Sequence, residues 1–591
     1  MGSKKYPYKG LLDILGNLSY SSTNAWTATD QTVYTLTTAG WDGFRMLLPI
    51  YLDHLINPTL TDEACYTEVY HVDGSAKDKG VVYSEMQAIE SQGWFLSGLE
   101  TQRTLYKVSG YKSETGGLTS NLRTLTNDEI REFHKQNYRS DNLSIIITGS
   151  INETEFLETM ESFDNELPDL PSIPLKRPFV DSEQDKPLTK RVVKTVEFPD
   201  KDESSGDVSL SWIGPDIKDV VTAQAVDILG SYLTKSPISL FHKHFIEIDN
   251  PLATSASFST DDYIHTGMNF YLGSVPVTEL ETLGDKVLKL IEEHASNPKE
   301  FDLIRIRDLL EQTKWKFIFS CENSPEGLAD ISILDFLYGE TDGSELKPWL
   351  KTLNEFEVLK SWSAEQWCDL LKKYYVDNKC AVMLSKPSAK CYKQLKDENK
   401  KLLKDRKLKL GKEGLEELKK KLKNAQDKND APIPNEILNK FKQPDPSKIN
   451  FIETKSFAVG LNKDIKNDEN DEIYKYISKD IPSDFPIYLH FENIDSQFVT
   501  LHILLSTLNM DPNLFKYIDI FVDLFSMPIK LEDGTELTFE EVVTELKRDT
   551  ITTKASTSFA SHFDEMVDFK IVVKREDYSK LVVLCYHLLF A

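Results

Sequence analysis

The feature that constrains this chain most is a pattern of strand, turn, strand and helix that recurs three times. In each copy an aromatic residue opens the first strand, an acidic residue follows it four or five positions later, and an alternating second strand leads into an amphipathic helix. The first strands of the copies fall at 24–30, 256–262 and 558–564. Alternating strands of this kind bury one face against helices. The pattern predicts an α+β fold made of repeated units of antiparallel sheet packed with helices.

The 591 residues are too many for one hydrophobic core, so several units are expected. Two clusters of prolines interrupt the pattern and predict linkers, because proline can continue neither a helix nor a central strand. The clusters are Pro168, Pro171, Pro174, Pro178 and Pro187, and then Pro432, Pro434, Pro444 and Pro446. We expect a first unit at 1–170, a second at 190–390, a helical linker at 391–445 and a third unit at 446–591. The first and third copies have fewer residues around them than the second, so the chain is expected to be truncated at both ends.

The linker has its own composition. Leu395 and Leu402 are seven residues apart, and so are Leu408, Leu415 and Leu422, among many lysines and with interruptions at Gly411 and Gly414. This spacing is typical of paired helices. It predicts a charged helical hairpin bridging two halves of the protein; a basic binding patch is the alternative.

The formal net charge of −26 argues against nucleic acid as a partner, since phosphate binding requires clustered Lys and Arg. The six cysteines are scattered, which suits reduced thiols inside a cell. No run of residues is long and apolar enough for a membrane span, and no targeting segment is evident. These features favour an intracellular, cytoplasmic protein, with a mitochondrial location as the alternative.

One pair of carboxylates stands out. A helix is predicted from Asp78 to about Glu100, and Asp78 and Glu85, seven residues apart, would then share a helical face. A metal ligand supported by a second acid has this arrangement. A solvated helix face has the same pattern, so spacing alone leaves both interpretations open.

Several short motifs carry a resemblance to a known family. They are residues 80–86 (GVVYSEM), 24–27 (NAWT), 115–118 (TGGL), and Asn142 followed by a strand at 143–149 (LSIIITG). At these places the chain resembles the inverted-zincin metalloproteases, which include pitrilysin, insulin-degrading enzyme and presequence protease. The presequence-protease-like branch is most similar.

The resemblance implies a role for individual residues. Glu85 matches the third zinc ligand, and Asp78 matches an acid that supports the site. Asn24 and Ala25 match an edge strand to which an unstructured peptide substrate adds as a further strand. The family's other two zinc ligands and its general base lie in H-x-x-E-H. That motif is absent from the 591 residues and is expected upstream of Met1.

The histidines of the chain do not replace the missing motif. His244 and His562 begin H-x-x-E strings that lack the second histidine, and His71 is expected on a loop surface before the Glu85 helix. Two hypotheses follow. The chain is an inactive fragment of a zinc metalloendopeptidase, or it is a non-catalytic scaffold or partner subunit with the same fold. In either case, open sheet edges favour self-association.

Overall fold

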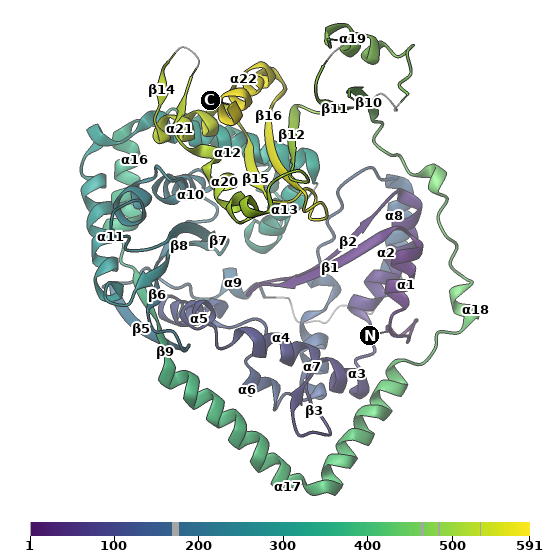
Figure 1. Cartoon of the computed structure of the whole chain (residues 1–591). Coiled ribbons are helices and arrows are strands. Elements are labelled where there is room, and N and C mark those ends of the chain that lie inside the picture. The colour runs from purple at the N-terminus through teal and green to yellow at the C-terminus, as the bar shows by residue number, and fades with distance from the viewer. Residues whose placement is uncertain are drawn as a thin grey trace. The chain divides into compact units, whose positions relative to one another are not determined.

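The computed structural model describes residues 2–167, 176–324, 326–461, 466–482, 485–531 and 534–590. Its chain divides into two compact units, Met1–Pro444 and Asp445–Ala591, which are described separately (Figure 1). Helices and antiparallel sheets occur in both units, so the predicted α+β class is confirmed. Pro168, Pro171 and Pro174 of the first predicted linker lie outside the described residues. The domain boundaries inferred from the sequence stay predictions.

The N-terminal part of the first unit is built on one hairpin. β1 (Ser21–Thr27) pairs antiparallel with β2 (Thr32–Thr38), and α2 (Trp41–Ile56) follows, as the first copy of the repeat predicts. α2 packs against α1 (Leu11–Leu18) and α8 (Glu153–Asp164). The buried apolar side chains around these helices are Leu11, Leu15, Leu47, Leu48, Ile50, Leu52 and Phe163.

The prediction of a strand at 143–149 is wrong. Leu143 has extended backbone angles (φ −119°, ψ 125°), but no described strand pairs with the residues that follow it. An extended segment becomes a strand only when a neighbouring backbone shares its hydrogen bonds. Leu143 and Ile145 pack instead against the apolar side chains of α2 and α8.

The prediction of a single helix from Asp78 to about Glu100 is also wrong. Asp78 belongs to β4 (Asp78–Lys79), which pairs with β3 (His71–Val72). The helical stretch that follows is divided into α4 (Val81–Ile89) and α5 (Gly93–Leu105). Asp78 and Glu85 therefore do not share a helical face. The neighbouring helices are α3 (Asp62–Glu68), α6 (Thr119–Leu122) and α7 (Asn127–Asn137).

A five-stranded sheet forms the centre of the first unit. Its strand order is β5-β9-β6-β8-β7, and every neighbouring pair is antiparallel except β5 and β9, which run parallel. The strands are β5 (Val192–Pro199), β6 (Ser205–Asp216), β7 (Ser255–Asp261), β8 (His265–Pro276) and β9 (Ala381–Ser388). β7, β8 and the helix after them are the second copy of the repeat.

Helices cover both faces of this sheet. On one face, α10 (Val220–Thr234) and α11 (Leu280–Ala295) bury Leu229 and Leu283 against Leu210 and Trp212 of β6. On the other face, α5 packs against β9, where Leu105 contacts the cluster containing Ala381 and Met383. Further helices of this part are α9 (Pro178–Asp181), α12 (Leu303–Asn323), α13 (Glu326–Tyr338), α14 (Leu346–Trp349), α15 (Leu353–Lys360) and α16 (Ala364–Leu371).

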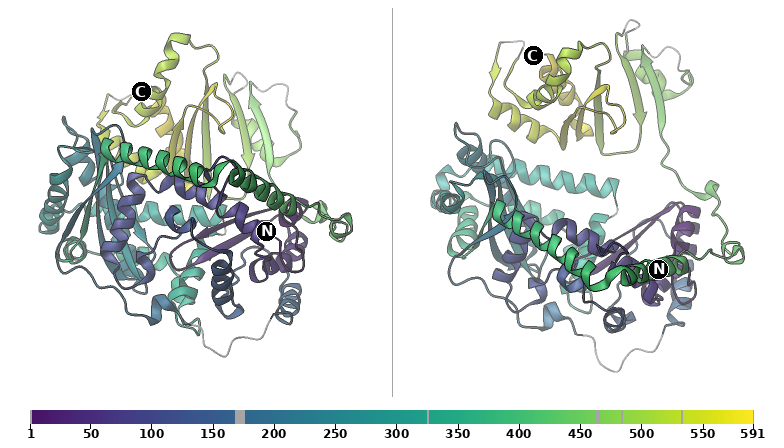
Figure 2. Two further views of the ribbon diagram at one scale, coloured as in Figure 1. Left: turned by 90° about the horizontal axis from the view of Figure 1, so that it is seen from below. Right: turned by 60° about the horizontal axis from the view of Figure 1, so that its bottom comes forward.

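A long, bent helix, α17 (Ala389–Asn429), follows β9. Gly411 interrupts it with φ 60° and ψ −171°, a conformation that favours glycine. Its first leg contacts β5 and its second leg contacts α3, and the legs diverge from the bend (Figures 1 and 2). A helix is present where the helical linker was predicted, but the predicted hairpin is wrong because the legs do not pair. The role of this segment as a linker stays a prediction. α18 (Asn435–Leu438) follows.

The second unit contains a three-stranded antiparallel sheet in the order β12-β16-β15. These strands are β12 (Phe498–Ser506), β15 (Thr552–Ser556) and β16 (Met566–Lys574), and α22 (Tyr578–Phe590) packs on one face. The first strand of the third repeat copy was expected at 558–564; it lies earlier, in β15, and 558–564 form the turn. Smaller elements are β10 (Lys455–Gly460), β11 (Tyr488–Asn493), β13 (Ile529–Lys530), β14 (Glu536–Leu537), α19 (Glu472–Asp480), α20 (Ile518–Asp523) and α21 (Phe539–Asp549).

Candidate functional site

Glu85 lies on the exposed side of α4. The helix begins after Gly80, whose φ is 126°, and a Cβ there would stand 2.3 Å from the carbonyl oxygen of Val69. Only glycine fits this turn without displacing the helix. Tyr83 and Met86 are buried, while Glu85 is exposed. Among the residues that the structure describes, none forms a hydrogen bond or an ion pair with the Glu85 carboxylate.

Asp78, by contrast, is surrounded by four partners from other parts of the first unit. Tyr70 donates to its Oδ1 at 2.7 Å, and Tyr83 donates to its Oδ2 at 3.2 Å. Arg406 of α17 lies 2.8 Å from Oδ1. Arg123 reaches Oδ2 at 3.3 Å through both Nε and Nη2. With a side chain only 9% exposed, Asp78 is a nearly buried carboxylate with both oxygens engaged.

These partners decide the charge of Asp78. Burial alone would raise the pKa of Asp78, but the hydrogen bonds from Tyr70 and Arg406, together with the charges of Arg406 and Arg123, lower the pKa below its usual value. Asp78 is therefore ionised at neutral pH and ties the start of α4 to α17. No local sequence pattern points to Arg406, which is one of many basic residues in a helix far along the chain. The supporting role of Asp78 at a metal site stays a prediction.

His71 and His244 each contact a backbone carbonyl oxygen. His71 was expected on a loop surface, but it is buried in β3, with Nδ1 2.9 Å from the Tyr66 carbonyl oxygen. Burial lowers the pKa of His71 despite that contact, so the imidazole is neutral. His244 places Nδ1 2.9 Å from the carbonyl oxygen of Leu240.

A catalytic zinc requires three protein ligands and an open position. Within the described ranges, no group of three or more His, Cys, Asp or Glu side chains is placed to hold a metal ion. Glu85 is a single carboxylate, and the Asp78 carboxylate already forms ion pairs with Arg123 and Arg406. The residues of this part of the chain therefore do not fit a catalytic zinc by themselves.

The predicted peptide-binding strand is open to solvent. Asn24 and Ala25 lie in β1, whose residues are exposed from Ser22 to Thr27, and β1 pairs with β2 alone among the described strands. The backbone N–H of Asn24 donates to Thr35 Oγ1 of β2 at 3.2 Å. The N–H of Ala25 donates instead to Asn24 Oδ1 at 2.9 Å. Because residues along a strand alternate in direction, this second donor faces the unpaired edge.

A chain of hydroxyl and carboxyl groups joins the β1–β2 turn to the second part of the unit. Tyr338 of α13 donates to Asp30 in that turn, and its hydroxyl lies 2.9 Å from the hydroxyl of Tyr111. Burial raises the pKa of Asp30, although the bond from Tyr338 opposes the rise. Burial likewise raises the pKa of Asp261, the last residue of β7, and of Asp262 in the turn that follows. Carboxyl groups from two repeat copies thus face the same acidic region.

Comparison with known proteins relates the chain to a peptidase family. A family model described as the peptidase M16 inactive domain matches residues 124–310. An uncharacterized protein of Saccharomyces cerevisiae, YOL098C, is 45% identical and covers 100% of this chain, which spans 58% of that relative. The mitochondrial presequence protease of Yarrowia lipolytica is 26% identical over 71% of this chain and 43% of its own length. A protease from Helicobacter pylori has a similar fold, with a TM-score of 0.51 and 17% identity over 63% of this chain and 84% of that structure.

Residues 124–310 match the M16 peptidase family, and the chain is similar to the presequence proteases of the inverted-zincin M16 group. It spans little more than half the length of the curated relatives that it matches most fully. None of the helices in the described ranges is long and apolar enough to cross a bilayer.

Proposed function

We propose that this chain supplies the third zinc ligand and the peptide-binding edge of an M16 zinc metalloendopeptidase. Glu85 is the ligand, Asp78 fixes the helix that carries it, and Asn24 and Ala25 pair with substrate. The observation that carries the proposal is the exposed, unpartnered Glu85 on a helix whose start is held by Gly80 and Asp78. An exposed carboxylate that has no partner and sits on a fixed helix is positioned to coordinate a metal ion. The 591 residues alone are expected to be inactive, because they contain no H-x-x-E-H.

The proposed substrates are unstructured peptides. An extended peptide would add to the open edge of β1 and accept a hydrogen bond from Ala25 in place of the Asn24 side chain. The acidic groups Asp30, Asp261 and Asp262 favour peptides that carry Lys or Arg. Relatives named presequence proteases are described as mitochondrial or chloroplastic. An intracellular location, cytoplasmic or mitochondrial, belongs to the same proposal.

The test joins the chain to a segment that carries H-x-x-E-H, beginning with any in-frame sequence before the Met1 codon. The joined protein should cleave an unstructured peptide in a zinc-dependent, chelator-sensitive way. Glu85→Gln should abolish both cleavage and tight zinc binding. Glu158→Gln, which changes another exposed glutamate of the first unit, should leave both intact. A joined protein that folds but shows no such cleavage would refute the proposal.

A second function deserves a test because the matching family model is described as an inactive domain. In this alternative the chain is a non-catalytic scaffold or partner subunit that binds peptides without cutting them. Metal content of the joined protein separates the two ideas. One equivalent of tightly bound zinc that is lost on Glu85→Gln would rule out the scaffold, and a folded joined protein without zinc would favour it.

A further inference from the structure

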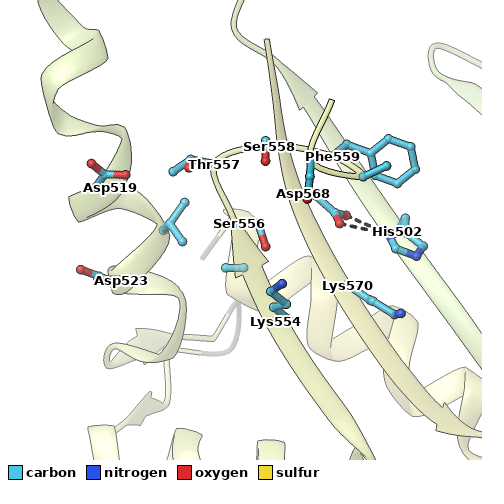
Figure 3. A pocket seen from close by; sticks show the side chains of 14 residues that line it. His502, Asp519, Asp523, Lys554, Ser556, Thr557, Ser558, Phe559, Asp568 and Lys570 are labelled. Carbon is cyan, nitrogen blue, oxygen red and sulfur yellow. Dashed lines mark hydrogen bonds and ion pairs between the residues drawn. The ribbon is translucent and has the colours of Figure 1, made fainter. Parts of the chain in front are cut away.

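The second unit contains a hollow that the proposed function does not use. It measures about 630 Å³ and lies on the face of the β12-β16-β15 sheet opposite α22, between that face, α20 and the β15–β16 turn (Figure 3). Its charged lining residues are His502, Asp519, Asp523, Lys554, Asp568 and Lys570. Hydroxyl groups come from Ser556, Thr557, Ser558 and Ser561.

Strand register places three of these residues in one row. His502 of β12 stands opposite Lys570 of β16, and Lys570 stands opposite Lys554 of β15. Directly opposed residues on antiparallel strands point to the same face, and like charges so placed repel each other. Neither lysine forms an ion pair or a hydrogen bond with any residue in the described part of the chain. Two unpaired, opposed cations in a protein of net charge −26 indicate a place for an anionic group.

The next row fixes His502. Its Nδ1 lies 2.9 Å from Oδ1 of Asp568, the diagonal neighbour on β16, and Asp568 is buried. The ring of Phe559 meets the His502 ring edge-on at 5.5 Å. The turn that carries Phe559 holds Ala560 and Ser561 in left-handed conformations (φ 51° and 58°), which non-glycine residues rarely adopt unless their surroundings enforce it. The turn that forms this wall of the hollow therefore has a defined conformation.

The opposite wall limits what the ligand can be. Asp519 and Asp523 project from α20 across the hollow from Lys554 (Figure 3). A compact multiply charged anion would meet these carboxylates, whereas a dipolar molecule would place its anionic end on the lysines and its cationic end on the aspartates. β15 is also the outer strand of the described sheet, so its free backbone edge faces the same region. A free edge pairs with peptide backbone.

We propose that this hollow binds the free carboxyl terminus of a short peptide. Lys554 and Lys570 hold the carboxylate, the hydroxyl-bearing turn and the edge of β15 contact the backbone, and Asp519 and Asp523 receive the amino end or a basic side chain. The site requires no metal and no contribution from Glu85, so its test is independent of the proposed peptidase.

The experiment measures binding of lysyl-trialanine to the full 591-residue chain by isothermal titration calorimetry. The peptide acid should bind, and its C-terminal amide should bind at least about tenfold more weakly, the loss expected for charge-assisted bonds. The double substitution Lys554→Met and Lys570→Met should cause a similar loss. The matched control, Lys475→Met and Lys479→Met on α19, removes the same charge from exposed, unpaired lysines of the second unit and should change nothing.

Folding is checked on the same samples by thermal unfolding without peptide. Because Lys554→Met and Lys570→Met remove a like-charge pair, the unliganded double variant should melt no lower than the parent chain. Equal binding of acid and amide, or full binding by the Lys554/Lys570 variant, would overturn the proposal. Tighter binding of inorganic phosphate than of the peptide acid would also overturn it, in favour of a phosphate-bearing ligand.

Discussion

Arg406→Met is the most informative single change in the first unit. Arg406 Nη1 contacts Asp78 Oδ1 at 2.8 Å and donates to the carbonyl oxygen of Ala76 at 2.9 Å, across 330 residues of sequence. The substitution keeps the helical propensity and most of the apolar stem but removes the cation. It therefore tests whether α17 holds the start of the Glu85 helix.

The magnitude follows from burial and from the partners that remain. The side chains of Arg406 and Asp78 are 16% and 9% exposed, so solvent screens the pair only partly. A hydrogen bond to a charged group contributes about 1.5–3 kcal/mol and one to a neutral carbonyl about 0.5–1.5 kcal/mol. Arg123, Tyr70 and Tyr83 still stabilise the Asp78 carboxylate, which removes the larger penalty of an isolated buried charge. We expect a loss of about 2–4 kcal/mol from the first unit.

The assay combines urea unfolding with hydrogen exchange of the peptide spanning α4. Lys407→Met is the matched control, since it removes the same charge from the neighbouring, exposed position of α17. Arg406→Met should lower stability and speed exchange in α4, and Lys407→Met should do neither. The pKa of Asp78 is lowered in the folded protein, so its contribution is present above the unfolded value and is lost as the pH falls through the folded pKa. Equal stability and exchange in the two variants, at neutral and acidic pH, would refute the reasoning.

Two further predictions concern the packing of the first unit. Burial raises the pKa of Glu355 to about 7, so its ionisation makes folding less favourable as the pH rises from about 4.5 to 7. Glu355→Gln should therefore flatten the pH profile of the unfolding free energy in that window and stabilise the protein at pH 8 by up to about 3 kcal/mol. An unchanged profile would contradict this. Gly80→Ala should destabilise the first unit by about 1–3 kcal/mol, because the added Cβ meets the Val69 carbonyl. Gly98→Ala in α5 is the control: its Cβ meets open space, and it should stabilise the unit by about 0.5–1 kcal/mol. Thermal unfolding measures both, and equal shifts of the melting temperature would contradict the account.

Local pattern was enough to predict the repeat elements of the first unit. Alternation from Thr32 to Leu36 and apolar spacing from Leu47 to Leu52 correspond to β2 and α2, because both patterns reflect burial on one face. The same reasoning found the mixed α+β architecture. Local pattern failed to predict the backbone conformation where contacts with residues distant in sequence determine it.

The division near Glu85 shows why. A continuous helix from Asp78 fits the apolar spacing, but Gly80 has a positive φ and lies close to the Val69 carbonyl, and the helix begins only after it. The third repeat copy is misplaced because the pattern predicts that Phe559 opens a strand, whereas Phe559 begins a turn and meets the His502 ring edge-on. Arg406 could not be found at all, since its contact with Asp78 depends on how α17 bends at Gly411 and passes β4.

The central claim is that this chain holds one ligand of a zinc site and lacks the others. Zinc content measured by mass spectrometry tests it most directly, first on the purified 591-residue chain and then on the chain joined to an H-x-x-E-H segment. The account predicts no stoichiometric zinc in the first sample, one equivalent in the second, and loss of that equivalent on Glu85→Gln. A full equivalent of tightly held zinc in the isolated chain, or in the joined protein after Glu85→Gln, would contradict it.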